Sequence, residues 1–351
     1  MIGTDKYNDT NITHSECGTH PITLIATKSP DRKSCFIWSF LIFSLLSLIS
    51  EISTGEENQG NILILLSDNG DVYLDVATTI TNSTIKSCRD KGLSCKNSNF
   101  DIVQVSSYDK QQHKNYRLVI TLGTQAALFS QKHITDTTTF SALIPKDNKL
   151  IEKSSNDKPQ HHYLYLNQPI ERSLLLIKVL SDRFKIIGSL INIKDKFLAS
   201  ELDKSAKKLE LSLILEAVDP SQNIGNSLNI LLGNIDIFLA LPDTDIHNNS
   251  TVSNILLSAY RKRIPLIGFS SAYVRAGALA AIYSSPKDIA YQVRDNIVTF
   301  FSLNPTPKRQ QMEEYFSVMF NKDVARSLDF PIKSETKLKE MILDRLRYDS
   351  E

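Results

Sequence analysis

From residue 61 onward, short apolar runs alternate with longer segments of helical periodicity. This alternation is typical of repeated β-α-β units, in which parallel strands form a sheet and helices cover both of its faces. Strands covered on both faces are apolar almost throughout, and most of these runs have that composition. The sequence therefore predicts an α/β fold built on parallel sheets.

The predicted strands fall into two blocks. In the first block they are residues 61–66, 101–105, 118–122 and 139–144. In the second block they are residues 185–191, 211–217, 235–241 and 265–269. A chain of 351 residues has the length of about two globular units, so we expect two Rossmann-like lobes.

Helices are predicted between these strands. In the first block they cover residues 73–91, with Gly92 as the stop, and residues 124–131. In the second block two apolar stripes at helical spacing predict helices that face the core: Leu198, Leu202, Ala206 and Leu209, and then Val252, Ile255, Leu256, Ala259 and Tyr260. We expect Asn249 or Ser250 to cap the second of these helices.

The parts of the chain differ in composition. Residues 1–55 combine a polar leader with an apolar segment, residues 56–165 form lobe 1, residues 166–285 form lobe 2, and residues 333–351 form a tail that we expect to be an exposed helix. The segment 146–160 is polar and contains Pro, Asn and Lys, so we interpret it as a linker or exposed loop between the two blocks.

The apolar segment near the N-terminus covers residues 35–50 and follows Asp31-Arg32-Lys33. It is shorter than the roughly twenty residues of a comfortable membrane span. Basic residues on its N-terminal side and the small residues Ser53-Thr54-Gly55 after it are typical of a cleaved signal peptide, which predicts a periplasmic protein. An uncleaved anchor in the inner membrane and a buried helix remain as alternatives.

Charge and cysteine content narrow the class of protein. Forty basic and thirty-nine acidic side chains give a net charge of +1, which does not favour nucleic acid or an anionic membrane surface as a partner.

Outside the N-terminal region the cysteines are Cys88 and Cys95. Their spacing around Gly92 allows a disulfide in an oxidising compartment, and two free thiols are the alternative. No His or second pair of Cys lies near them in sequence, which argues against a metal site.

A ligand site is expected where strands end, because open parallel sheets bind ligands outside the carboxyl ends of their strands. Polar side chains or helix starts follow several predicted strands. The candidate ligand-binding residues in lobe 1 are Ser67, Asp68, Gly123, Thr124 and Gln125, and those in lobe 2 are Asn192, Asp243, Ser270, Tyr273 and Arg275. Thr124 is placed to cap a helix whose first amides would attract a carboxylate. Each polar residue could instead serve only as a cap or turn.

Aromatic side chains near these positions could stack on a flat ligand or could pack within the hinge. They are Tyr73, Phe269, Tyr273 and Tyr283. His247, close to Asp243 and Asp245, could be a ligand or a base, but we interpret it as part of a solvated turn.

No motif for an enzyme or a cofactor site is present. The sequence has no phosphate-binding P-loop, no dinucleotide-binding glycine fingerprint, no nucleophile elbow and no zinc-protease motif. His161 and His162 are adjacent, so on an extended strand they point to opposite faces and make a poor metal site. We therefore predict a protein that is not an enzyme, with no cofactor and no metal. Dispersed catalytic residues remain the alternative.

Several segments resemble a known family. They are residues 121–127 (TLGTQAA), 241–243 (LPD), 264–270 (IPLIGFS), 272–279 (AYVRAGAL), 165–169 (YLNQP) and 315–328 (YFSVMFNKDVARSL). Together they resemble the strand-end loops, the hinge and the closing strand and helix of solute-binding proteins of bacterial ABC importers. The family is the uncharacterised and aromatic-amino-acid type with a type I periplasmic binding protein fold.

The resemblance extends over residues 61–332 and implies a hinge-connected protein whose lobes exchange segments. On that basis, residues 286–312 complete lobe 1 and residues 313–332 complete lobe 2. It also implies a monomer that delivers a small solute to an ABC permease and its ATPase. The loop 67–73 differs from the version that binds aromatic amino acids, so the ligand stays open. A membrane-anchored sensor or a protein-interaction module on the same fold is the alternative function.

Overall fold

The computed structural model describes residues 60–109, 116–146, 160–302, 310–312 and 315–348. The predicted leader and its apolar segment, residues 1–55, lie outside these ranges, so the structure does not bear on the signal peptide. Within the described ranges, no helix has both the length and the apolar character that a membrane crossing needs.

A first sheet contains only parallel strands. Its spatial order is β11, β5, β4, β3, β1, β2. The strands are β1 (Ile62–Leu66), β2 (Phe100–Gln104), β3 (Leu118–Leu122), β4 (Thr139–Ile144), β5 (His161–Tyr165) and β11 (Gln310–Met312). Every residue of β1 and β3, two neighbouring strands inside the sheet, is buried, as expected for strands covered on both faces.

A second sheet has the spatial order β12, β10, β9, β8, β6, β7. Its strands are β6 (Ile186–Asn192), β7 (Ser212–Val218), β8 (Ile237–Leu239), β9 (Leu266–Gly268), β10 (Ala280–Tyr283) and β12 (Ser317–Phe320). All pairings are parallel except that of β12 with β10, which is antiparallel. The predicted α/β fold with two largely parallel sheets is confirmed.

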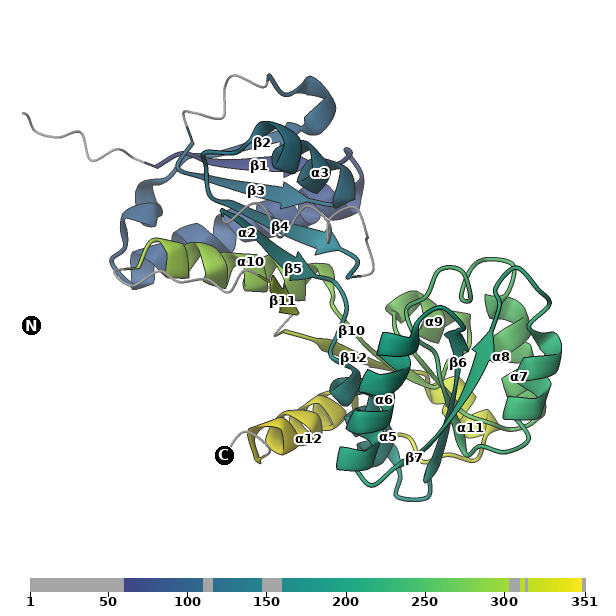
Figure 1. The fold of residues 1–351 in the computed structure, drawn as a ribbon. Coiled ribbons are helices and arrows are strands. Elements are labelled where there is room, and N and C mark those ends of the chain that lie inside the picture. The colour runs from purple at the N-terminus through teal and green to yellow at the C-terminus, as the bar shows by residue number, and fades with distance from the viewer. Residues whose placement is uncertain (1–59, 110–115, 147–159, 303–309, 313–314, 349–351) are drawn as a thin grey trace, which may run out of the picture. The chain divides into compact units, whose positions relative to one another are not determined.

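Helices cover both faces of each sheet (Figure 1). On the first sheet, α2 (Asp71–Asp90) and α10 (Pro286–Phe300) share one face, and α3 (Thr124–His133) packs on the other. On the second sheet, one face carries α5 (Ile170–Leu180), α6 (Lys196–Lys208), α11 (Lys322–Ser327) and α12 (Glu335–Tyr348), and the other carries α7 (Gly225–Leu231), α8 (Val252–Arg261) and α9 (Ser271–Ala276).

The chain returns to the first sheet after it has built most of the second. Helix α10 packs along α2 through buried side chains that include Ile289, Val293 and Ile297. Strand β11 then pairs with β5, and β12 adds to the second sheet beside β10. Segments far apart in sequence therefore share each hydrophobic core.

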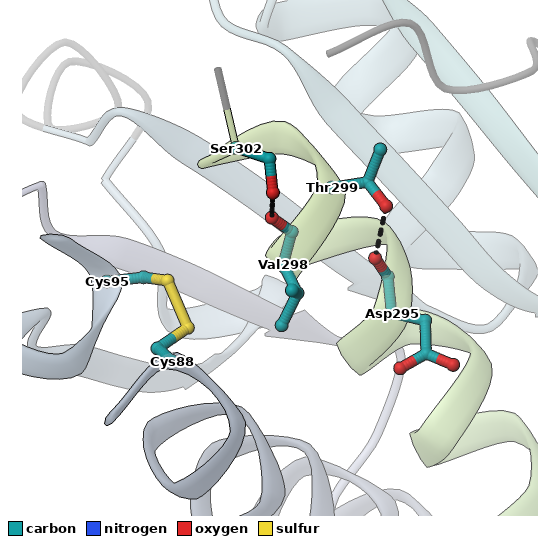
Figure 2. Close-up of a disulfide and its surroundings, with 6 residues drawn as sticks. All are labelled: Cys88, Cys95, Asp295, Val298, Thr299 and Ser302. Carbon is teal, nitrogen blue, oxygen red and sulfur yellow. Dashed lines mark hydrogen bonds between the residues drawn. A yellow bond between two sulfur atoms is a disulfide. The ribbon is translucent and has the colours of Figure 1, made fainter. Parts of the chain in front are cut away.

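The end of α2 is fixed by a glycine and a disulfide. The helix stops before Gly92, whose positive φ of 65° lets the chain reverse, as predicted. Cys88 near the helix end is bonded to Cys95, with 5.6 Å between their Cα atoms. Both cysteines are fully buried and belong to the same core as Val298 of α10 (Figure 2). The bridge thus anchors the reversed chain where α2 and α10 pack.

The structure corrects three expectations about segments and caps. Strand β5 pairs directly with β4, so the segment 146–160 joins two strands of one sheet and does not link the two blocks. The terminal helix α12 is not an exposed tail, because Leu338 and Ile342 are fully buried in the core beside α5. The N-cap of α8 is Thr251, whereas Asn249 or Ser250 was expected.

Candidate functional site

Seven of the ten predicted ligand residues end or follow a strand at the point where the strand order of its sheet reverses, and the other three, Ser270, Tyr273 and Arg275, follow the next strand, β9. In the first sheet the chain runs from β1 outward to β2 and then crosses to β3 on the other side of β1. In the second sheet it runs from β6 to β7 and then crosses to β8. The loops that follow β1 and β3 diverge there, as do those that follow β6 and β8. Open α/β sheets generally bind ligands at such a reversal.

Ser67 fixes the first-sheet loop to a helix. It follows β1, and its backbone N–H donates to the carbonyl of Leu122 at the end of β3 over 3.0 Å. Its hydroxyl oxygen accepts the N–H of Ala126 in the first turn of α3, also at 3.0 Å. A side chain from another strand thus satisfies one of the amides that a helix start leaves without an internal partner.

Gly123 is the N-cap of α3, so the expected capping role of Thr124 is wrong and Thr124 is the first helical residue. The φ of Gly123 is 92°, a value that side-chain-bearing residues rarely adopt. A Cβ at this position would lie 2.5 Å from the Ser67 hydroxyl and 2.9 Å from the Tyr73 ring. Only glycine lets these two side chains approach the start of α3 so closely.

The first turn of α3 leaves the backbone amides of Thr124 and Gln125 without partners inside the helix, as any helix start does. Both residues are at least partly exposed. Asp68 is exposed as well, and its carboxylate accepts the N–H of Gly70 at 2.6 Å, which shapes the turn before α2. Burial, aided by the Asp68 charge, raises the pKa of Tyr73, so this phenol stays neutral at physiological pH.

The second-sheet loops are shaped by similar turns. Asn192 ends β6, and its side-chain oxygen accepts the N–H of Lys194 at 3.1 Å. Asp243 follows β8 and accepts the N–H groups of Asp245 and Ile246, at 2.8 and 3.2 Å. These carboxylate and amide groups therefore hold the loops in place with one oxygen and remain partly accessible.

The residues after β9 have divided roles. Ser270 caps α9 by accepting the N–H of Tyr273 at 3.2 Å. Arg275 is exposed. Burial raises the pKa of the nearby Tyr283 phenol, and the positive charge of Arg275 partly offsets that rise. Tyr273 itself is only 4% exposed and packs its ring against Gly268, so its side chain belongs to the core and not to the loop surface.

His247 was expected in a solvated turn, and this expectation is wrong. Its side chain is only 7% exposed and lies among the rings of Phe238, Phe269 and Tyr273. Its Nδ1 is 2.9 Å from the Tyr273 hydroxyl. Burial lowers the pKa of the imidazole to about 4, so the ring is neutral at physiological pH. The polar neighbours in sequence gave no sign of the aromatic residues that surround it in space.

Exposed apolar side chains also flank the reversal points, and sequence reasoning missed them. Phe197 and Ile193, just after β6, are 69% and 54% exposed, and Val72 at the start of α2 is 54% exposed. Their signal was present, because Phe197 is an apolar residue beside the core stripe that begins at Leu198.

Polar contacts join the chain segments that pass between the two sheets. Gln168, which follows β5, donates from its side-chain nitrogen to the Ser284 hydroxyl at 2.7 Å and to the carbonyl of Tyr315 at 3.1 Å. The Ser284 hydroxyl in turn donates to the carbonyl of Leu166 at 3.0 Å. All three passages between the sheets thus meet at one hydrogen-bonded crossing.

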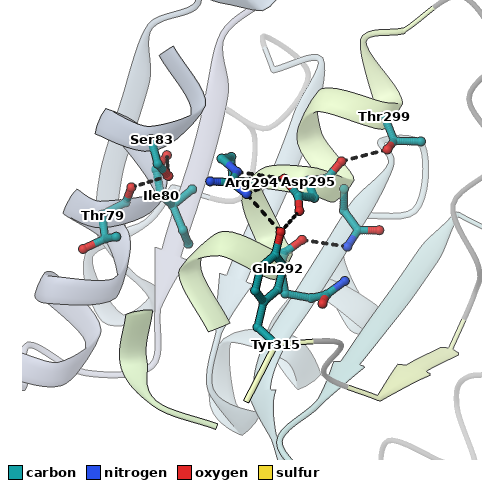
Figure 3. A network of polar contacts seen from close by, with 9 residues as sticks. Thr79, Ile80, Ser83, Gln292, Arg294, Asp295, Thr299 and Tyr315 are labelled. Atoms are coloured by element: carbon teal, nitrogen blue, oxygen red, sulfur yellow. Dashed lines mark hydrogen bonds and ion pairs between the residues drawn. The ribbon is translucent and has the colours of Figure 1, made fainter. Parts of the chain in front are cut away.

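The third passage is also tied to the first-sheet core. The Tyr315 hydroxyl donates to the Asp295 carboxylate of α10 and accepts from Arg294 at 3.1 Å, as Figure 3 shows. No group of three or more His, Cys, Asp or Glu side chains in the described residues could hold a metal ion.

Known proteins share this arrangement. An open, ligand-free substrate-binding protein with adhesive properties from Clostridium difficile superimposes with a TM-score of 0.61 at 16% identity, over 78% of this chain and 96% of that one. A conserved domain protein from Vibrio cholerae superimposes with a TM-score of 0.50 at 17% identity, over 81% and 98% of the two chains. Both are similar to this chain in fold.

Sequence comparison agrees with the fold. A tyrosine-binding protein of Clostridioides difficile is 23% identical over 176 residues, which are 48% of this chain. The chain spans about half the length of that curated relative, 50%. The sequence profile of the ABC transporter substrate binding protein family matches residues 76–338, most of the chain. The chain therefore belongs to the ABC transporter substrate-binding protein family.

Proposed function

We propose that this protein is the exported solute-binding component of an ABC-type importer and that it traps a small ligand between two lobes, each built on one sheet. The observation that carries the proposal is the position of the polar loop residues at the strand-order reversal of both sheets. No covalent chemistry is required for this function. The partners would be a membrane permease and its ATPase.

The lobe 1 loop would contribute Ser67, Asp68, Gly123 and the amides of Thr124 and Gln125. The start of α3 favours a negatively charged group such as a carboxylate, because its free amides and the helix dipole point there. The lobe 2 loops would contribute Asn192, Asp243, Ser270 and Arg275, with Tyr273 supporting them from the core. The aspartates favour a positively charged group such as an ammonium.

These two preferences together match a zwitterionic amino acid. The exposed side chains of Val72, Ile193 and Phe197 favour one with an apolar or aromatic side chain. The name of the tyrosine-binding relative supports the same class. L-Tyrosine is therefore the first compound to test.

Ligand trapping would work by a population shift. A ligand that contacts both loop sets gains more contacts when the lobes close, so it favours the closed state by that difference in affinity. The three passages meet at Gln168, and this crossing would act as the hinge. The side chains of Gln168 and Ser284 join all three segments there by hydrogen bonds.

Binding of L-tyrosine and of other amino acids, sugars and nucleosides to the purified protein would test the proposal. A ligand present at one hundred times its dissociation constant adds about 2.7 kcal/mol to the unfolding free energy and raises the thermal midpoint by a few degrees. Arg275→Ala should weaken binding at least tenfold with an unchanged midpoint of the free protein. Asp243→Ala should weaken binding as much without unfolding the protein, although its midpoint should fall slightly because two backbone amides lose their acceptor. Lys337→Ala on α12 should bind normally. Absence of binding across all the compounds would sink the proposal.

Export forms part of the same proposal. In a host with a Sec pathway, a cleaved signal peptide would leave a mature chain that begins after residue 50, which mass spectrometry of the secreted protein detects. An intact N-terminus in the membrane fraction would instead identify an uncleaved anchor.

A further inference from the structure

His247 connects two loops of the proposed ligand site through its contact with Tyr273. It ends the turn that begins at Asp243, and its backbone N–H donates to the backbone carbonyl of Asp243 at 2.8 Å. Its ring lies 5.7 Å from the Tyr273 ring, centroid to centroid, and its Nδ1 shares a hydrogen bond with the Tyr273 hydroxyl. Tyr273 belongs to α9, the helix that carries Arg275 and follows the Ser270 cap.

The surroundings of the ring accept only its neutral form. Phe238 of β8 and Phe269 after β9 pack against it edge to face, with centroids 6.5 and 5.8 Å away. In the described part of the chain its Nε2 has no hydrogen-bond partner, although it is buried. A protonated imidazole carries an N–H on both nitrogens, so it would hold a buried charge and a donor with no acceptor.

No charged group compensates for that proton. The ionisable residues on the packed elements are Asp243 and Asp245 of its own turn and Tyr273 and Arg275 of α9, while β8 (Ile237–Leu239) contributes none. Burial alone accounts for the low pKa of His247, and no neighbouring carboxylate raises it. Protonation is therefore compatible only with a ring that has left the aromatic cluster.

We propose that His247 is a positioning residue that locks the turn after β8 to α9, so that the lobe 2 ligand loops move as one body, and that its protonation separates them and releases the ligand. This inference rests on the proposed function, since it assigns a purpose to loops that hold a ligand there. It predicts tight binding near neutral pH and weakened binding in an acidic compartment.

Hydrogen exchange of the purified full chain tests the lock without any ligand. If opening exposes His247 with an ordinary pKa of 6.5 and closing restores a pKa of about 4, the local opening constant should rise about thirtyfold from pH 8 to pH 5, after correction for intrinsic exchange rates. The rise should appear in peptides covering residues 243–247 and 270–277. It should be absent from the first-sheet peptides.

Two variants separate the lock from general stability. His247→Asn keeps a hydrogen-bonding group near the Nδ1 position and cannot be protonated, so its exchange in those peptides should be independent of pH over the same range. Tyr273→Phe removes the shared hydrogen bond and should raise exchange at both pH values. His133→Asn at the end of α3 is the matched control and should keep the wild-type pH response.

Binding of L-tyrosine at pH 7.5 and pH 5 completes the experiment. In the wild type the affinity should fall from pH 7.5 to pH 5 in proportion to the fall in the closed population that the measured opening constants give, and in His247→Asn it should show no such fall. Equal pH responses of exchange in the wild type and His247→Asn would overturn the lock. If the exchange responses differ as expected but L-tyrosine binds neither protein, the lock stands and the proposed ligand is wrong.

Discussion

Ser67 and Ala126 are joined by a hydrogen bond of 3.0 Å across 59 residues of sequence, from the backbone N–H of Ala126 to the Ser67 hydroxyl oxygen. The bond attaches the loop after β1 to the first turn of α3, and it does so at the strand-order reversal of the first sheet. One side chain therefore both caps a helix and sets the shape of a candidate ligand loop.

Replacing Ser67 with Ala should lower the free energy of unfolding by about 1 kcal/mol, the usual cost of a lost helix cap. Denaturation in urea measures this change. Ser106→Ala, at an exposed serine outside the site, should leave the midpoint unchanged. Equal midpoints for both variants would show that the Ala126 amide finds another partner.

Gly123→Ala should lower the free energy of unfolding by more than the strain of a positive φ alone. The new Cβ would lie 2.5 Å from the Ser67 hydroxyl and 2.9 Å from the Tyr73 ring, so both side chains must move. Gly92→Ala is the matched control, because Gly92 also has a positive φ but has no atom within 4 Å of the added Cβ. We expect the free energy of unfolding, measured by urea denaturation, to fall by about 1 kcal/mol in Gly92→Ala and by at least twice that in Gly123→Ala.

Breaking the Cys88 to Cys95 disulfide should destabilise the protein. The cysteines are 7 residues apart, and closing so short a loop constrains the unfolded chain by about 2.5 kcal/mol. Thermal unfolding with and without a reductant measures the effect, and a variant with Ser at both positions should match the reduced wild type. An oxidised protein that melts at the same temperature as the reduced one would contradict the prediction.

Acidification should destabilise the fold through His247. Its pKa is lowered from 6.5 in the unfolded chain to about 4 in the folded protein, so the unfolded state binds the proton first. Stability from the neutral ring is fully present above pH 6.5, is lost as the pH falls from 6.5 to 4, and changes no further below that. The loss amounts to about 3 kcal/mol. Urea denaturation of wild type and His247→Asn across this range should show a difference that grows as the pH falls.

Leu338→Ala should cost about 2 to 5 kcal/mol, because the side chain is fully buried in the core beside α5. Lys337→Ala, one residue earlier on the same helix and exposed, should cost less than 0.5 kcal/mol, roughly the usual limit for a surface change. Thermal or chemical denaturation distinguishes them. Similar small losses in both would mean that α12 detaches easily from the sheet.

The strands that sequence reasoning located best are those with both faces buried. Residues 118–122 and 139–144 were predicted with the boundaries that the structure has, because each is apolar or small along its whole length. Strand β5 was missed because its sequence, HHYLY, looks polar. In the fold His161 is buried with its Nε2 2.9 Å from the Ile134 carbonyl, and the buried Tyr163 hydroxyl accepts from Gln131 at 2.8 Å, contacts that local sequence does not show.

The candidate site was likewise predicted only in part from the sequence. The rule that ligand loops follow strands placed Ser67 and Asp243 at the reversal points without knowledge of the strand order. It could not tell an exposed loop residue from a core residue, so it grouped Tyr273 with Ser270 and treated His247 as solvated. Those outcomes depend on packing between α9 and the turn after β8, which are separate segments of the chain.

The return of α10 to the first sheet determines when that sheet can fold during synthesis. The core on one face of β1 is closed by Ile289, Val293 and Ile297, which the ribosome makes after almost all of the second sheet. Residues 62–165 alone would leave the apolar side of α2 that packs on α10 without its cover. The nascent first lobe therefore stays incomplete, and accessible to chaperones, until translation has passed residue 300.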